Sequence, residues 1–168
     1  MNVKKIIMIM FIIIVSLSIS NCVFAALVSN YEITDRGSER NFDYIELSMN
    51  IDDSLLGTEI DYSSSIVIFR QENYKDKVIR LLMTEKDTGG TVAEFEISDY
   101  TFDSDTNKLT IKVRWSNRYE FDSIRVSVEE AVGESSFYYE KIEGEEGFII
   151  SYDEAYGTTT TPDDPNPV

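Results

Sequence analysis

The segment Leu109-Thr110-Ile111-Lys112-Val113-Arg114-Trp115 alternates apolar and polar side chains without a break. Successive side chains of a β-strand point to opposite faces, so a period of two describes a strand with one buried face and one wet face. A helix would repeat its apolar positions about every 3.6 residues instead. Because sheets with one solvated face are characteristically antiparallel, this segment predicts an antiparallel all-β protein.

The same alternation recurs at 45–51, 124–128 and 148–152, so it dominates the chain between residues 27 and 156. Many short strands at this spacing favour a two-sheet antiparallel sandwich of about eight to nine strands, with the Ig-like class as the default topology. The strands are predicted at 27–34, 42–51, 64–70, 77–86, 91–102, 108–116, 123–131, 135–142 and 147–153.

Three polar segments are expected to turn the chain between these strands. Asp87-Thr88-Gly89-Gly90 predicts a tight hairpin, because glycine tolerates the positive φ that such hairpins need. The segments 103–107 and 143–147 are rich in Asp, Asn, Glu and Gly and predict two further turns.

Two stretches of the predicted sheets are irregular. Residues 73–86 fit a helix capped by Asn73 or a strand that continues through Leu81, and the following Gly-Gly pair favours the strand. Within 91–102 the apolar phase shifts by one residue, which predicts a β-bulge near Ser98-Asp99.

The N-terminal segment has the organisation of a secretory signal peptide. The pair Lys4-Lys5 precedes an apolar run over residues 6–15, and the segment 16–20, in which serines alternate with Leu and Ile, is less hydrophobic. In Val23-Phe24-Ala25 the small residue occupies the position before the cut, so cleavage is predicted between Ala25 and Ala26. The protein is therefore expected to be exported, and to be secreted or held at the cell surface.

Two alternatives for this segment stay open. Ile19-Ser20-Asn21-Cys22 is similar to a lipoprotein box, in which Cys22 would carry the lipid, although Asn21 is a poor fit. Residues 6–26 are also about long enough to span a bilayer as an uncleaved anchor. Contact with a membrane is expected only through one of these two routes.

The domain organisation follows from these boundaries: a signal peptide at 1–25, a β-sandwich domain at 26–156 and a tail at 157–168. The tail holds four consecutive threonines and all three prolines of the chain. It has almost nothing apolar to bury, so it is expected to be disordered. It resembles the Thr/Pro linkers between modules of bacterial surface proteins.

Composition excludes several classes of function. The chain has 31 acidic and 15 basic residues, a net charge of −16, no histidine and one cysteine. Triads with an imidazole base and His-ligated zinc sites cannot be built without histidine. Nucleic acid is not expected as a partner, since phosphate binding depends on clustered Lys and Arg.

The best candidate for a metal site is the triplet Asp103, Asp105 and Asn107. Oxygen ligands at alternate positions open the Ca²⁺-binding loop of EF-hands. The match then ends, because Lys108 stands where that loop needs Gly and Arg114 where it needs Glu. The alternative is that these residues cap their own hairpin turn. Ca²⁺ is the only cofactor that the sequence suggests.

Exposed tyrosines are the candidates for ligand binding. Aromatic rings on a sandwich face can stack on sugars, and Tyr138, Tyr119 and Tyr152 are the candidates here. The alternative is that tyrosine simply suits half-buried positions in strands.

Paired carboxylates could support a small hydrolase, but Glu129-Glu130 and Glu145-Glu146 are sequence neighbours. Neighbours on a strand face opposite ways, so neither pair converges on one substrate. We therefore expect a non-catalytic binding or structural module whose partner is an extracellular protein or polysaccharide. The alternative function is a carbohydrate-binding accessory domain of a secreted enzyme system.

Overall fold

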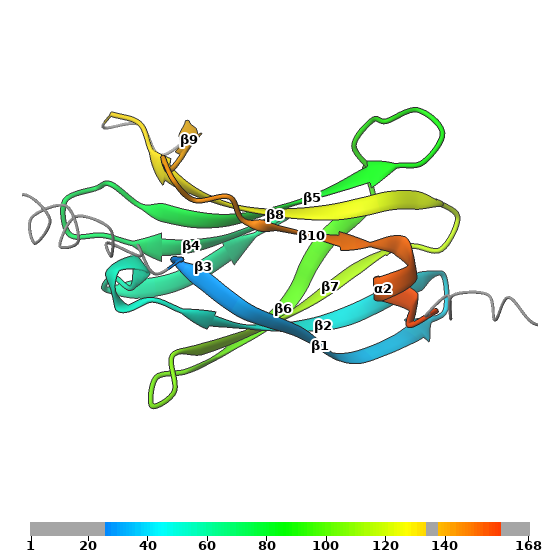
Figure 1. Cartoon of the computed structure of the whole chain (residues 1–168), viewed down its shortest axis with the longest axis horizontal. Coiled ribbons are helices and arrows are strands. Elements are labelled where there is room, and N and C mark those ends of the chain that lie inside the picture. Colours follow the sequence, from blue (N-terminus) through cyan, green and yellow to red (C-terminus); the bar gives the residue numbers. More distant parts are fainter. Residues whose placement is uncertain (1–25, 134–137, 159–168) are drawn as a thin grey trace, which may run out of the picture.

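The computed structural model describes residues 26–133 and 138–158, and within them the chain is all-β. The signal segment with Ala25 and Cys22, and most of the predicted tail, lie outside the described residues. Two antiparallel sheets face each other (Figure 1). The described residues contain ten strands, where the sequence predicted eight or nine.

The four-stranded sheet has the order β1-β2-β7-β6. Its strands are β1 (Val28–Glu39), β2 (Phe42–Ile51), β7 (Lys108–Ser116) and β6 (Phe95–Asp103). The six-stranded sheet has the order β10-β8-β5-β4-β3, and β9 also pairs with β8. Its strands are β10 (Phe148–Ser151), β8 (Phe121–Ala131), β5 (Lys77–Glu85), β4 (Ile66–Arg70), β3 (Glu59–Ser63) and β9 (Tyr139–Lys141).

The core lies between the sheets and is formed by the alternate side chains of each strand that point toward the opposite sheet. On β7 the four apolar residues of the alternating segment are buried, and Trp115 is only 1% exposed. On β5 the alternate residues Ile79, Leu81 and Met83 belong to the same core cluster. The prediction of half-buried strands is confirmed, and residues 77–85 form a strand rather than a helix.

Tyrosine contacts close both open sides of the sandwich. On one side the ring of Tyr31 in β1 stacks on Phe148 in β10, with centroids 4.0 Å apart. On the other side Tyr100 of β6 donates its hydroxyl to the carbonyl of Ile60 in β3 at 2.9 Å. Tyr62 also meets Tyr100 edge to face. These contacts hold the edges of the two sheets together, because each pair joins one strand of each sheet.

The tight turn predicted at Gly89-Gly90 forms, but it does not join two strands of one sheet; the predicted bulge is confirmed. The strands on either side of Gly89-Gly90, β5 and β6, belong to different sheets, so this segment crosses between the sheets. Before the crossing, a short hairpin forms: Thr84 bridges Thr91, and the amide of Glu85 donates to the carbonyl of Gly90 at 2.7 Å. The register of β6 against β7 shifts between Ile97 and Asp99, where the bulge was expected.

The segment 143–147 does not turn between two neighbouring strands. Both β9 and β10 pair with β8, one after the other along the same edge of that strand. The segment 143–147 is the irregular connection between them. Gly147 makes this possible, with φ of +66° and a backbone so close to β8 that a Cβ would lie 2.0 Å from the carbonyl oxygen of Val126.

The predicted last strand ends early, in helix α2 (Tyr152–Tyr156). Ser151 caps its first turn by accepting a hydrogen bond from the amide of Glu154 at 3.2 Å. Gly157 ends it in the left-handed conformation, φ +70°. A single 3-10 turn, η1 (Asp53–Leu55), follows β2.

Candidate functional site

The outer face of the four-stranded sheet carries rows of polar side chains across β2, β7 and β6. We call this surface the polar face. Its rows, read across the three strands, are Tyr44–Arg114–Glu96, Glu46–Lys112–Asp99 and Ser48–Thr110–Thr101. Each row is set by register, since residues directly opposite on neighbouring antiparallel strands share a face.

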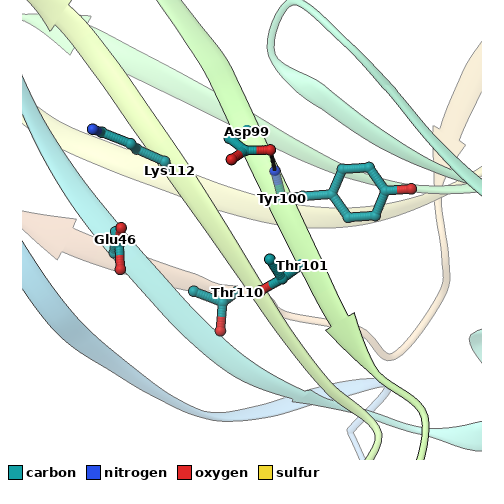
Figure 2. Close-up of a pocket in the computed structure, with 6 residues that line it drawn as sticks. All are labelled: Glu46, Asp99, Tyr100, Thr101, Thr110 and Lys112. Atoms are coloured by element: carbon teal, nitrogen blue, oxygen red, sulfur yellow. Dashed lines mark hydrogen bonds between the residues drawn. The ribbon is translucent and has the colours of Figure 1, made fainter.

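A shallow hollow lies on the polar face and is shown in Figure 2. It is lined by Glu46, Asp99, Tyr100, Thr101, Thr110 and Lys112, and its volume is about 100 Å³. Sites for drug-sized ligands typically enclose about 300–1,000 Å³. The ring of Tyr100 points away from the other lining residues in Figure 2, toward its hydrogen bond with β3. The hollow can therefore hold only a very small group.

Two aromatic rings of β2, Tyr44 on the polar face and Phe42 two residues before it, are covered by cations. The ammonium of Lys112 lies 3.9 Å from the ring centroid of Tyr44 and donates to Glu39 at 2.7 Å. The hydrogen bond to Glu39 is the main cause that raises the pKa of Lys112 above its ordinary value. The guanidinium of Arg114 lies 5.1 Å from the ring centroid of Phe42. Cations on these rings stabilise the sheet surface and take up the ring faces that a sugar would need.

A second cluster lies where α2 meets the β1–β2 hairpin, and we call it the C-terminal clasp: Arg36, Asp43, Trp115 and Tyr156. The hydroxyl of Tyr156 donates to Asp43 at 2.6 Å and accepts from the indole nitrogen of Trp115 at 3.3 Å. Burial, followed by the hydrogen bond to Asp43, raises the pKa of Tyr156 well above its ordinary value. The phenol is therefore held in its neutral, hydrogen-bonding form.

Arg36 completes the clasp from β1. Its Nε donates to the carbonyl of Ala155 at 3.0 Å, and its Nη2 donates to the carbonyl of Glu154 at 3.1 Å. The last carbonyls of a helix have no partner within the helix, and a cation there also complements the helix dipole. The clasp therefore fixes α2 to β1 and β2. A cavity of about 150 Å³ beside it is lined by clasp residues and their neighbours.

The predicted metal triplet forms the β6–β7 hairpin turn. One carboxylate oxygen of Asp103 accepts from the amide of Asp105 at 2.9 Å, and the other accepts from the hydroxyl of Thr106 at 2.8 Å. The bond from Thr106 is the main cause that lowers the pKa of Asp103. The side chain of Asn107 donates to Asp53. In the described part of the chain no cluster of three or more acidic or cysteine side chains is arranged to hold a metal ion.

The three candidate tyrosines do not lie together. Tyr138 is 75% exposed and follows the C-terminal end of β8, where its carbonyl accepts from the amide of Val132 at 2.8 Å. Tyr119 precedes the other end of β8 and packs partly buried against the core. Tyr152 lies at that same end, with its ring against Phe121. Because β8 has 11 residues, its ends are roughly 35 Å apart.

The clasp could not be predicted from the sequence. Asp43 and Tyr156 are 113 positions apart, and no local pattern connects them. The one available signal was Ser151 followed three residues later by Glu154, with Gly157 beyond. This is the spacing of a short capped helix.

Within the residues that the structure describes, no helix is long and apolar enough to cross a membrane. Searches for similar proteins found no match to this chain among protein-family models, curated proteins or solved structures.

Proposed function

We propose that this chain is an exported, non-catalytic module that acts outside the cell, secreted or at the cell surface, as a binding or structural unit. The observation that carries the proposal is the position of the two ends of the described domain. Figure 1 shows the start of β1 and helix α2 toward opposite ends of the long axis. From Val28 to the clasp residue Arg36, β1 runs opposite Ile51 to Ile45 of β2, which is the length of six strand residues or roughly 20 Å.

This arrangement suits a module that is attached to other structures at both ends and carries tension between them. Tension on the C-terminal end of α2 would be transmitted to β1 through Arg36 and to β2 through Asp43. β1 is in turn hydrogen bonded to β2 from Val28 to Glu39. Ladder bonds of an antiparallel pair are perpendicular to the strands, so tension along β1 would load many of them together. The resemblance of the following segment to a Thr/Pro linker agrees with such a role.

Two acidic side chains with altered pKa values do not suit the role of a general acid. Hydrogen bonds to Ser54 lower the pKa of Asp52, and the turn around Asp103 lowers the pKa of that residue. A general acid at neutral pH needs the opposite change, a raised pKa.

We further propose that the sandwich belongs to the Ig-like class. In that class the first, second, fifth and fourth strands form one sheet, and the seventh, sixth and third form the other. If β3 and β4 are an inserted hairpin, and β9 and β10 are two parts of one interrupted edge strand, the remaining strands give β1-β2-β7-β6 and β10-β8-β5 in this same order. The insertion then extends the second sheet beyond β5.

The test is to fractionate cells that produce the chain and to determine its N-terminus by mass spectrometry. A chain in the medium that begins at Ala26, or a surface-attached chain with a lipid on Cys22, would support the proposal. A cytosolic chain that retains residues 1–25 would overturn it.

Carbohydrate binding is the second candidate function, and one observation favours it: the large exposed ring of Tyr138. The exported protein should then be retained by an insoluble polysaccharide, and Tyr138→Ala should abolish retention. Tyr62→Ala is a matched control, because Tyr62 is less exposed and packs against Tyr100. Equal behaviour of the unaltered protein and Tyr138→Ala would contradict this candidate.

A further inference from the structure

The edges of the two sheets differ in how they are protected against pairing with another strand. An edge strand presents unpaired backbone donors and acceptors, and natural proteins usually blunt it with charges, bulges or short length. β1 carries four charged residues and two register shifts, and β6 carries three acidic residues and one shift. β3 carries Glu59 and Asp61, and β9 has only three residues, of which two are charged.

Of these protective features β10 has only one, its short length of four residues. Its sequence, Phe148-Ile149-Ile150-Ser151, has no charged side chain, and it pairs with β8 in unbroken register. β8 is the only strand to which β10 is hydrogen bonded, so β10 ends the order of the six-stranded sheet in the described part of the chain. It is therefore the edge with the least protection against an added strand.

The side chains around this edge also favour an added strand. Ile150 points into the core, whereas Ile149 points to the outer face and is 54% exposed. On the outer face of the sheet, Ile149 lies beside Arg125 of β8, and Arg125 lies beside Leu82 of β5. Leu82 is 38% exposed. A strand beside β10 would place an apolar side chain against Ile149 and remove both from water.

The charges that flank β10 select the kind of strand that can pair with it. Glu143, Glu145 and Glu146 precede the strand, and Asp153 and Glu154 follow it. Four of these five are exposed, and Glu145 accepts a hydrogen bond from the amide of Leu27 at 3.1 Å. In an antiparallel pair of two copies, the acids before one β10 would lie near the acids after the other. Like charges across strands are destabilising, so a second copy is disfavoured.

We propose that the free edge of β10 binds an extended segment of a cationic partner protein by β-strand addition, with Lys or Arg on both sides of a short apolar core. Backbone hydrogen bonds would supply the affinity, and the acidic flanks together with Ile149 would supply the specificity. The inference deepens the binding role proposed above, because it assigns that role a surface and a class of partner.

The test uses the exported protein and the synthetic peptide Lys-Lys-Val-Thr-Val-Thr-Lys-Lys. The peptide should bind, and it should slow amide hydrogen exchange at residues 148–151. A peptide with Glu in place of every Lys, and one with Pro at the central Val, should each bind at least about fivefold more weakly. Binding should also weaken as salt is added, because the flanking charges are exposed.

Two variants distinguish binding at the edge strand β10 from binding anywhere else on the outer face of the six-stranded sheet. Ile149→Lys adds the kind of charge that protects other edges and should weaken binding about fivefold or more. Leu82→Lys makes the same change on the same outer face, but in a strand with both edges paired, and should stay within about twofold. The hydrogen-exchange result on the unaltered protein decides the matter if Ile149→Lys fails to fold.

Several outcomes would overturn the proposal: no binding of the Lys peptide, equal binding of the Glu peptide, protection at another edge, or a homodimer joined through β10. If export from Ala26 is observed while these results fail, only the β10 inference is lost. A cytosolic chain with an intact signal segment would instead remove the proposed function.

Discussion

Replacing Tyr156 with Phe removes one hydroxyl from the C-terminal clasp and leaves the ring in place. That hydroxyl donates to the carboxylate of Asp43 at 2.6 Å, and the net contribution of a hydrogen bond to a charged group is about 1.5–3 kcal/mol. Asp43 keeps its second bond, from Ser38 at 2.6 Å, and the phenol is only partly buried. Because the buried indole nitrogen of Trp115 also loses its acceptor, we expect Tyr156→Phe to lower the free energy of unfolding by at least about 2 kcal/mol. For a domain of this size the melting temperature should fall by about 4–8 °C.

The assay is thermal and urea unfolding followed by circular dichroism at neutral pH. Asp43→Asn keeps an acceptor for Tyr156 but removes the charge, so it should cost about half as much. Tyr138→Phe, which removes a hydroxyl from an exposed ring, should change the free energy of unfolding by less than about 0.5 kcal/mol. If Tyr156→Phe is no more destabilising than Tyr138→Phe, the hydrogen bond from Tyr156 to Asp43 does not stabilise the fold.

The same substitution predicts a change at alkaline pH. The ordinary pKa of the phenol is 10.0, and the folded protein raises it. Below pH 10 the stabilisation is complete. As the pH rises further, the unfolded chain ionises at this tyrosine first and the free energy of unfolding falls. Tyr156→Phe should therefore lose less stability than the unaltered protein between pH 10 and pH 11.

Three further predictions concern single positions. Gly147→Ala should lower the free energy of unfolding by about 3 kcal/mol or more, because the added Cβ would clash with β8. Gly144→Ala, also at positive φ but with open space around it, should lower it by only about 1 kcal/mol, as measured by urea unfolding. Because the pKa of Asp103 is lowered, its contribution to stability is present above about pH 4 and lost as the pH falls through the lowered value. Asp103→Asn should lose less stability on acidification, and Ca²⁺ compared with chelator should leave the melting temperature of the unaltered protein unchanged; a rise with Ca²⁺ would contradict the assignment as a turn. Arg36→Lys should leave the core intact but expose the α2 region to limited proteolysis, since lysine cannot reproduce the two-carbonyl contact; equal proteolysis rates would contradict this.

The strands with clean alternation were predictable from sequence, because burial of one face produces the pattern directly. β2 and β7 have the bounds 42–51 and 108–116 that alternation predicts. β3 was missed, since it is an edge strand of five residues in which none is buried. Weak burial leaves a weak pattern, and pairing with β4 completes the strand.

The connections between strands were predicted less well than the strands. Gly89-Gly90 predicts a tight turn, and Gly89 does have a positive φ of 67°. Turn residues report local backbone shape, however, and not the sheet to which the next strand belongs. The same limit applies to the clasp, where the hydrogen bond from Tyr156 to Asp43 depends on the packing of α2 against β2.

The clasp also gives the protein a built-in optical reporter. Trp115 is the one tryptophan of the chain, and its indole nitrogen donates to the hydroxyl of Tyr156. The rings of Phe121 and Tyr156 meet it edge to face at 5.3 and 6.1 Å. Release of α2 would bring water to the indole while the sheets stay paired. Intrinsic fluorescence would therefore register detachment of the C-terminal end before global unfolding, without any label attached to the protein.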